Sequence, residues 1–120
     1  MKLGRIVIDA GHGGHDHGTT GKSGAVEKEV VLDVALRLGK MLEEVGTEVI
    51  YTRSDDTYIP LEKRTRIANE KHADLFLSIH ANASRARGAR GSEVYFLSYQ
   101  ASDDESRRIA QAEGAAEPVP

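Results

Sequence analysis

The segment Asp74–His80 constrains the fold more than any other part of the chain. Its sequence, Asp-Leu-Phe-Leu-Ser-Ile-His, is nearly all apolar and lacks the alternation of polar and apolar residues that marks a half-exposed strand. Such a run is expected for a central strand covered on both faces, as in the sheets of α/β proteins. The polar residue at its carboxyl end, His80, is therefore expected at the edge of a buried core.

The rest of the pattern extends this strand into a sheet flanked by helices. From residue 28 onward, apolar side chains recur at three- and four-residue spacing, which predicts a helix that ends at Gly46. A second helix is expected to begin after Pro60. Further strands are expected at residues 5–9, 47–52 and 92–98. The expected apolar face of the first helix comprises Val30, Val31, Val34, Leu38, Met41, Leu42 and Val45.

This order of elements predicts the fold class. Strand, helix, strand, helix, strand, strand is typical of an α/β fold with an open, mostly parallel sheet flanked by helices. The 120 residues are enough for one domain with a hydrophobic core and too few for two ordinary ones. A single domain is therefore expected.

Composition excludes several classes of function. The formal net charge of −3 provides no basic field for a polyanion, so nucleic-acid binding is not expected. No apolar run approaches the roughly 20 residues of a membrane helix, and no membrane span is expected. Residues 1–5 place a charge where a signal peptide needs its apolar stretch, so no signal peptide is expected there. The chain has no cysteine, so any metal must be held by imidazole and carboxylate groups.

Two histidines and a glutamate are the candidate metal ligands. His12 follows the first expected strand, and His80 closes the strand at residues 74–80. Because parallel strands bring their carboxyl ends to one edge of a sheet, both imidazoles can meet there. Glu27 lies where the first helix begins, near the same edge. Two histidines and one glutamate form a ligand set typical of catalytic zinc.

Simpler interpretations of the same residues stay open. Taken alone, His12 is more typical of a glycine-rich loop than of a metal ligand. Glu27 alone is also typical of a first helical turn, where the helix dipole favours an acid. His15 and His17 are rival ligands, although we expect them to be solvated or at the rim of the site. Asp9 is expected to anchor the loop and orient a ligand.

Three sequence motifs carry a family resemblance. In order and spacing, the chain resembles the N-acetylmuramoyl-L-alanine amidases of the amidase-3 family at Ile8–Gly14 with Asp16 and Gly18, at Ser23–Lys28, and at Ser78–Asn82. The resemblance implies that His12, Glu27 and His80 bind Zn²⁺. It also implies that the substrate is bacterial peptidoglycan, cut at the amide bond between N-acetylmuramic acid and L-alanine. A location in the periplasm or the extracellular cell envelope follows from that substrate.

Two further residues fit the family pattern. Arg64 lies in the second expected helix, and Asn82 follows the strand that ends at His80. The resemblance gives Arg64 a structural or substrate-edge role, and Asn82 is expected to support the ligands or contact substrate.

The carboxyl-terminal part of the sequence departs from the family. Residues 1–98 resemble the N-terminal bulk of the catalytic domain, but no segment matches the second glutamate that serves the family as general base. Residues 99–120 resemble the start of a regulatory helix, followed by a tail. In some members such a helix covers the zinc until a partner moves it. Glu105 or Glu113 would then supply an inhibitory carboxylate, and a regulatory activator protein is an expected partner.

Three functional hypotheses follow. The first is a zinc-dependent peptidoglycan amidase. The second is a non-catalytic or autoinhibited zinc-containing module that binds the cell wall. It is favoured because no segment of the sequence matches the glutamate that serves the family as general base. The third is a metal-free α/β interaction domain.

Overall fold

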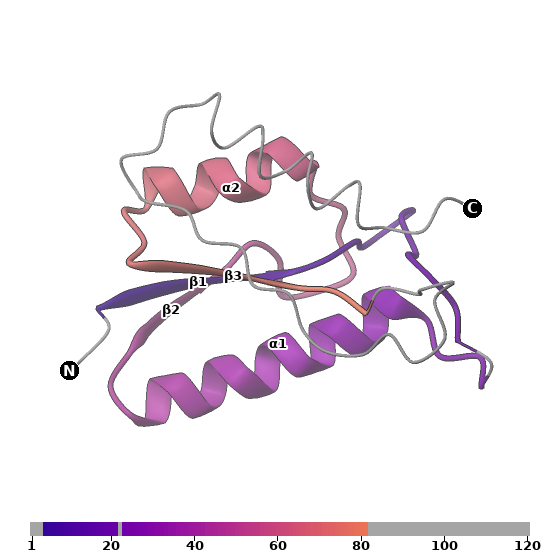
Figure 1. The fold of residues 1–120 in the computed structure, drawn as a ribbon, viewed down its shortest axis with the longest axis horizontal. Helices are drawn as coiled ribbons and strands as arrows, with labels where there is room; N and C mark the ends of the chain where they lie inside the picture. The colour runs from indigo at the N-terminus through magenta and orange to yellow at the C-terminus, as the bar shows by residue number, and fades with distance from the viewer. Residues whose placement is uncertain (1–3, 22, 82–120) are drawn as a thin grey trace, which may run out of the picture.

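A computed structural model of the chain describes residues 4–21 and 23–81. Three strands and two helices are present there, in the order β1 (Arg5–Ala10), α1 (Glu27–Glu44), β2 (Glu48–Tyr51), α2 (Leu61–Glu70) and β3 (Leu75–Ile79). The strands form one parallel sheet in the order β2-β1-β3. Helix α1 covers one face of this sheet and α2 the other (Figure 1). The predicted α/β architecture with an open parallel sheet is confirmed.

The pairing of the strands puts β1 in the middle of the described sheet. β1 pairs with β2 from Arg5 opposite Glu48, and with β3 from Ile6 opposite Leu75. The sequence predicted a central position for the strand at residues 74–80, but within the described residues β3 pairs with β1 alone. The prediction that both faces of this strand are covered holds, because α1 and α2 both contact β3.

Side chains of β1 alternate between two buried clusters. The cluster on the α1 side contains Ile6, Ile8, Ala10, Val31 and Ala35. The cluster on the α2 side contains Val7, Ala68, Ala73 and Phe76. Burying each large aliphatic or aromatic side chain stabilises the fold by about 1.5–3 kcal/mol, so these two layers hold the helices against the sheet. The polar Asp9 shares the strand face of Val7 and is fully buried.

Helix α1 packs a different face against the sheet from the one that its sequence pattern predicts. Its end is as expected, with Gly46 in the left-handed region at a φ of 89°. The side toward the sheet carries Val31, Ala35 and Gly39, all buried. Four residues of the expected apolar face are instead exposed: Val30, Val34, Met41 and Val45. The prediction was wrong for these four, because successive helical positions differ by about 100° in direction. The face that packs against the sheet runs along Val31, Ala35 and Gly39 and includes the partly buried Leu38 and Leu42.

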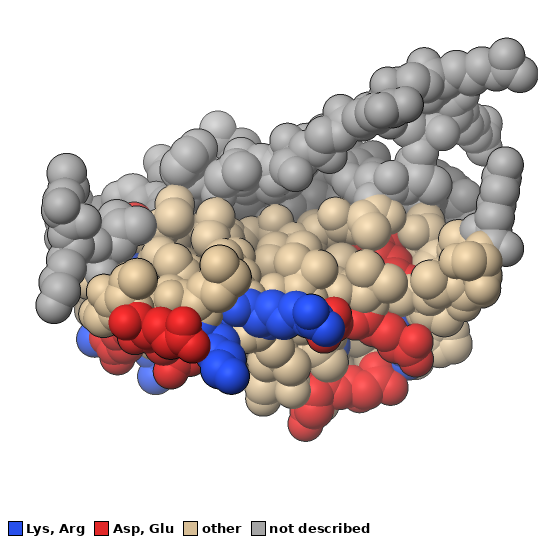
Figure 2. Space-filling model, turned by 90° about the horizontal axis from the view of Figure 1, so that it is seen from below, with Lys and Arg blue, Asp and Glu red and all other residues tan. Residues whose placement is uncertain are grey.

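The α1 side of the molecule carries charges of both signs. Figure 2 views the molecule from this side, and acidic and basic side chains are interspersed there with uncharged surface. This view contains no extended field of one sign. In the described part of the chain, no helix is long and apolar enough to cross a membrane.

Several predicted features lie outside the described residues. They are the strand at residues 92–98, the division of the chain at residue 98, the helix start and tail at residues 99–120, and the site candidates Asn82, Glu105 and Glu113.

Candidate metal centre

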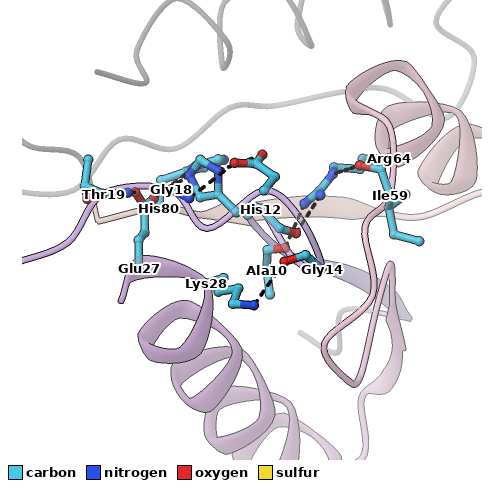
Figure 3. Close-up of polar contacts among 12 residues, drawn as sticks. Ala10, His12, Gly14, Gly18, Thr19, Glu27, Lys28, Ile59, Arg64 and His80 are labelled. Atoms are coloured by element: carbon cyan, nitrogen blue, oxygen red, sulfur yellow. Dashed lines mark hydrogen bonds and ion pairs between the residues drawn. The ribbon is translucent and has the colours of Figure 1, made fainter. Parts of the chain in front are cut away.

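His12, Glu27 and His80 come together at the carboxyl edge of the sheet (Figure 3). His12 follows β1, His80 follows β3, and Glu27 is the first residue of α1. Each offers one ligand atom, and these atoms all lie within 4.8 Å of one another. Glu27 Oε2 is 2.8 Å from His12 Nε2 and 3.5 Å from His80 Nδ1. The side chains are 1%, 0% and 8% exposed for His12, Glu27 and His80, so the cluster is largely shielded from solvent.

A tight turn after β1 brings His12 to this position. His12 itself has a φ of 63°, in the left-handed region that residues with a side chain seldom adopt. The loop then returns to His12 and Glu27 at Gly18, which has a φ of 70°. A Cβ at Gly18 would lie 2.7 Å from His12 Cδ2 and 2.8 Å from Glu27 Oε1. Position 18 therefore requires glycine both for its backbone conformation and for its contact with two candidate ligands.

The imidazole of His80 packs against the backbone of Gly11. A Cβ at Gly11 would lie 2.5 Å from His80 Nδ1 and 3.0 Å from Nε2, so the ring occupies the space of the absent side chain. The His80 and His12 rings meet edge to face, with centroids 5.2 Å apart and planes at 85°. Gly11 thus permits the close approach of the segment that follows β3.

Glu27 is held by hydrogen bonds to both carboxylate oxygens. Oε1 accepts the Thr19 N–H at 3.0 Å and the Thr19 hydroxyl at 2.9 Å, and Oε2 accepts the Ala81 N–H at 3.0 Å. Burial alone would raise the pKa of Glu27, but contacts with His12 and His80 and these two N–H groups lower it well below its usual range. Glu27 is therefore ionised, as a metal ligand must be.

The second ring nitrogen of His12 also faces a carboxylate. His12 Nδ1 lies 3.0 Å from Asp16 Oδ2. The imidazole thus has an acidic partner on each side, with Glu27 at Nε2. A metal-ligating histidine usually donates its second N–H to such a partner, which fixes its tautomer and ring orientation.

Arg64 ties the His12 turn to the core from the α2 side. Its guanidinium lies 3.0 Å from Asp9 Oδ1 and donates to the carbonyl oxygens of Ala10 and His12 at 2.7 and 2.8 Å. It also donates to the Ile59 carbonyl oxygen at 2.8 Å. Arg64 thus fixes the backbone on either side of the point where β1 ends, as Figure 3 shows.

A second buried guanidinium, that of Arg53, holds the same turn. It donates to the carbonyl oxygens of Ala10 at 3.0 Å and of Gly11 and Asp55 at 2.8 Å, and to that of Lys28 at 2.9 Å. Burial and the nearby Arg64 lower the pKa of Arg53. An arginine nevertheless stays charged in proteins, so these are charge-assisted hydrogen bonds.

The chain matches the N-acetylmuramoyl-L-alanine amidase family, amidase-3, over residues 6–114. It belongs to this family. AmiC of Escherichia coli is 42% identical over 114 residues, and AmiA of Escherichia coli is 41% identical over 115 residues. These alignments cover 93% and 95% of the present chain. The solved catalytic domain of the amidase CwlV from Bacillus (Paenibacillus) polymyxa var. colistinus is 40% identical, with a TM-score of 0.67 over 72% of the present chain.

The chain spans only part of each relative. The matches cover 27% of AmiC and 40% of AmiA from Escherichia coli, and 50% of the solved CwlV catalytic domain. The shared part contains the sheet edge that carries His12, Glu27 and His80.

The structure places most of the site residues that the sequence predicted. It brings the three candidate ligands together, as the positions of the strand ends indicated. Asp9 and Arg64 lie beneath the His12 turn, and Asp9 contacts Thr52, Arg64 and Ser78. His17 is exposed, and the exposed His15 stacks against Tyr58, so both are peripheral as expected.

Sequence reasoning missed three contributors to the site: Asp16, Thr19 and Arg53. Asp16 was noted only as part of a family motif, although its position four residues after His12 could have suggested a partner for the ring. Thr19 and Arg53 have no such local signal. Thr19 meets Glu27 eight residues further on, and Arg53 meets the end of β1 across 43 positions.

Proposed function

We propose that this chain contributes the zinc-binding part of an enzyme that hydrolyses the amide bond between N-acetylmuramic acid and L-alanine in peptidoglycan. The observation that carries the proposal is the convergence of His12, Glu27 and His80, whose ligand atoms lie within 4.8 Å of one another. Membership of the N-acetylmuramoyl-L-alanine amidase family supplies the reaction and the substrate class. A location in the periplasm or outside the cell follows, because peptidoglycan lies there.

The donor set favours zinc over the harder divalent cations. Two imidazole nitrogens and one carboxylate oxygen suit Zn²⁺, whereas Mg²⁺ and Ca²⁺ prefer sites made of oxygen ligands alone. Three protein ligands are also the number found in catalytic zinc sites, which keep a fourth position for water or substrate. A bound Zn²⁺ supplies a Lewis acid that polarises a carbonyl and lowers the pKa of a bound water to about 7.

The residues of this chain prepare the site in two ways. Glu27 is ionised and held at both oxygens, so it provides a fixed negative charge beside two imidazoles. Arg53 and Arg64 fix the backbone from Ala10 to His12, which holds the first imidazole in place. Such prior positioning of reacting groups lowers the entropic part of an activation barrier.

Amide hydrolysis also needs a general base, and Glu27 is unsuited to that role. Within residues 4–21 and 23–81, Glu27 is the only carboxylate in the metal-ligand group. Its oxygens are engaged by Thr19, Ala81 and His12. We therefore assign the role of base to a group other than the three candidate ligands. This observation also favours the second candidate function, a zinc-containing module that binds the cell wall without cutting it.

Metal analysis combined with a peptidoglycan assay tests the proposal. The purified chain is expected to hold about one zinc per molecule, to lose it to a chelator and to recover it on re-addition. If the amount of stem peptide released from purified cell walls rises and falls with the zinc content of the protein, the result would support the proposed amidase activity. Zinc binding together with cell-wall binding but no release would indicate the second function. Absence of zinc binding, or equal binding by His12→Ala, would overturn both.

A further inference from the structure

A short stretch of the glycine-rich loop, residues 16–19, contacts two candidate ligands from outside the metal-ligand group. Asp16 meets His12 and Thr19 meets Glu27. We propose that Asp16 and Thr19 are positioning residues that select the ligating atoms, so that His12 binds through Nε2 and Glu27 through Oε2 alone. This inference rests on the proposed metal site and adds to it how the coordination number is limited.

Asp16 is fixed at both its backbone and its side chain. Its N–H and C=O pair with Gly13 at 3.0 and 2.8 Å, and its Oδ1 accepts the Gly18 N–H at 3.2 Å. The remaining oxygen, Oδ2, lies 3.0 Å from His12 Nδ1. A carboxylate held at this place accepts a hydrogen bond from Nδ1–H, which leaves the lone pair of Nε2 for a metal. Nε2 is also the nitrogen that faces Glu27.

Thr19 donates two hydrogen bonds to one carboxylate oxygen of Glu27. Its N–H and hydroxyl both approach Oε1, at 3.0 and 2.9 Å, and its carbonyl accepts the Glu27 N–H at 2.8 Å. The hydroxyl also lies 3.1 Å from the carbonyl oxygen of Ala81, next to His80. Three hydrogen bonds thus lock Thr19 and Glu27 together. They turn Oε1 toward the loop and leave Oε2 facing both imidazoles.

The selection of atoms limits how many positions the protein fills. One oxygen from Glu27 and one nitrogen each from His12 and His80 make three ligands, which leaves a place for water or substrate. A Glu27 that bound through both oxygens would fill a fourth position. Thr19 prevents this because two donors already satisfy Oε1. The side chain of Thr19 therefore has a function beyond closing the loop.

Metal affinity tests the two residues with matched controls. Partners that orient a ligand typically change metal affinity by about 10- to 100-fold when removed. We expect Asp16→Ala to weaken zinc binding by about this factor. Asp16→Asn keeps a hydrogen-bond acceptor but not the charge, so its zinc affinity should fall by less than that of Asp16→Ala. Asp33→Ala removes an exposed carboxylate of α1 and should bind zinc as the wild type does. Competition with a chromophoric chelator measures each dissociation constant.

Cobalt substitution reports coordination number without any turnover. Thr19→Val keeps the shape of the side chain and removes the hydroxyl, so Glu27 gains freedom to bind through both oxygens. The d–d absorption of Co²⁺ is weaker at higher coordination number, and we expect a weaker band in this variant. Thr19→Ser should restore the wild-type spectrum, and Thr20→Val, an exposed neighbour, should leave it unchanged.

Nitrogen NMR of the zinc-loaded wild type provides a test that needs no variant. We expect His12 to carry its proton on Nδ1 and to bind zinc through Nε2. A metal on Nδ1, or wild-type affinity in Asp16→Ala together with a wild-type cobalt spectrum in Thr19→Val, would overturn the inference while the metal site stands. A wild type that binds neither zinc nor cobalt would instead refute the proposed function.

Discussion

The Arg64 guanidinium lies 3.0 Å from the Asp9 carboxylate, with the two side chains 1% and 0% exposed. Asp9 also accepts hydrogen bonds from the hydroxyls of Thr52 and Ser78, so all three described strands or their ends meet at this carboxylate. The attraction within a buried ion pair is largely offset by the cost of removing both charges from water. The pair therefore fixes the positions of the two side chains more than it adds net stability. Arg64 in turn fixes the backbone of His12 through the hydrogen bond that it donates to the His12 carbonyl oxygen.

Removing one member of this pair should be costly. Arg64→Met leaves Asp9 as a buried carboxylate without its counter-ion, and we expect the free energy of unfolding to fall by about 3–5 kcal/mol. Urea denaturation measures the change. The matched control is Arg37→Met, which removes an exposed partner of Asp33 on α1 and should cost about 0.5 kcal/mol or less. Similar losses in the two variants would contradict the role given to the buried pair.

Gly18 should be required for metal binding as well as for the loop. Gly18→Ala places a Cβ against His12 and Glu27 in a residue with a φ of 70°. Gly24→Ala is a close control, since Gly24 has a φ of 87° and no atom within 4 Å of its Cβ position. Both variants should lose about 1 kcal/mol of stability from backbone strain. Only Gly18→Ala should also weaken zinc binding, which isothermal titration calorimetry would show. Equal zinc affinities would argue against contact between residue 18 and the ligands.

Zinc should stabilise the folded chain through the three converging side chains. At a free zinc concentration 100 times the dissociation constant, binding is expected to add about 2.7 kcal/mol to the free energy of unfolding. A chelator should remove this gain, and His80→Ala should abolish the response. His17→Ala provides the control, because His17 is exposed and was one of two rival candidates. Thermal denaturation with and without zinc checks all three proteins, and an unchanged response in His80→Ala would exclude His80 as a ligand.

The sequence predicted those parts of the site that follow from chain topology. His12 and His80 each come at the end of a strand, and parallel pairing of β1 with β3 is enough to bring them to one edge. Glu27 meets them because α1 starts at that edge. Strand and helix order therefore predicted that these three side chains meet, and the family resemblance suggested that they bind a metal.

The order of strands and helices does not predict how a loop folds back onto the core. It also does not predict which face of a helix packs against the sheet. Arg53 stands next to Ser54, Asp55 and Asp56, a context typical of a solvated loop, yet it is buried against the end of β1. Apolar periodicity likewise could not distinguish Val31, which faces the sheet, from Val30, which is exposed. Both outcomes are set by tertiary contacts across many positions of sequence.

At Arg53, the effect of the positive charge can be separated from the effect of the hydrogen-bonding geometry of the guanidinium group. Its guanidinium donates to four carbonyl oxygens, those of Ala10, Gly11, Lys28 and Asp55, from three different nitrogen atoms. Lysine keeps the positive charge but presents a single ammonium group, which cannot reach all four acceptors.

Arg53→Lys should therefore be destabilising although it conserves charge. Each buried acceptor left without its charged donor costs about 1.5–3 kcal/mol, so the loss should exceed the effect of an ordinary surface change. Arg66→Lys, at an exposed position of α2, should stay within about 0.5 kcal/mol of the wild type. Zinc affinity should fall in Arg53→Lys as well, because Arg53 holds the backbone of Gly11, which supports His80 and precedes His12. Denaturant titration and zinc competition on both variants test this, and an Arg53→Lys protein with wild-type stability would show that charge alone suffices at this position.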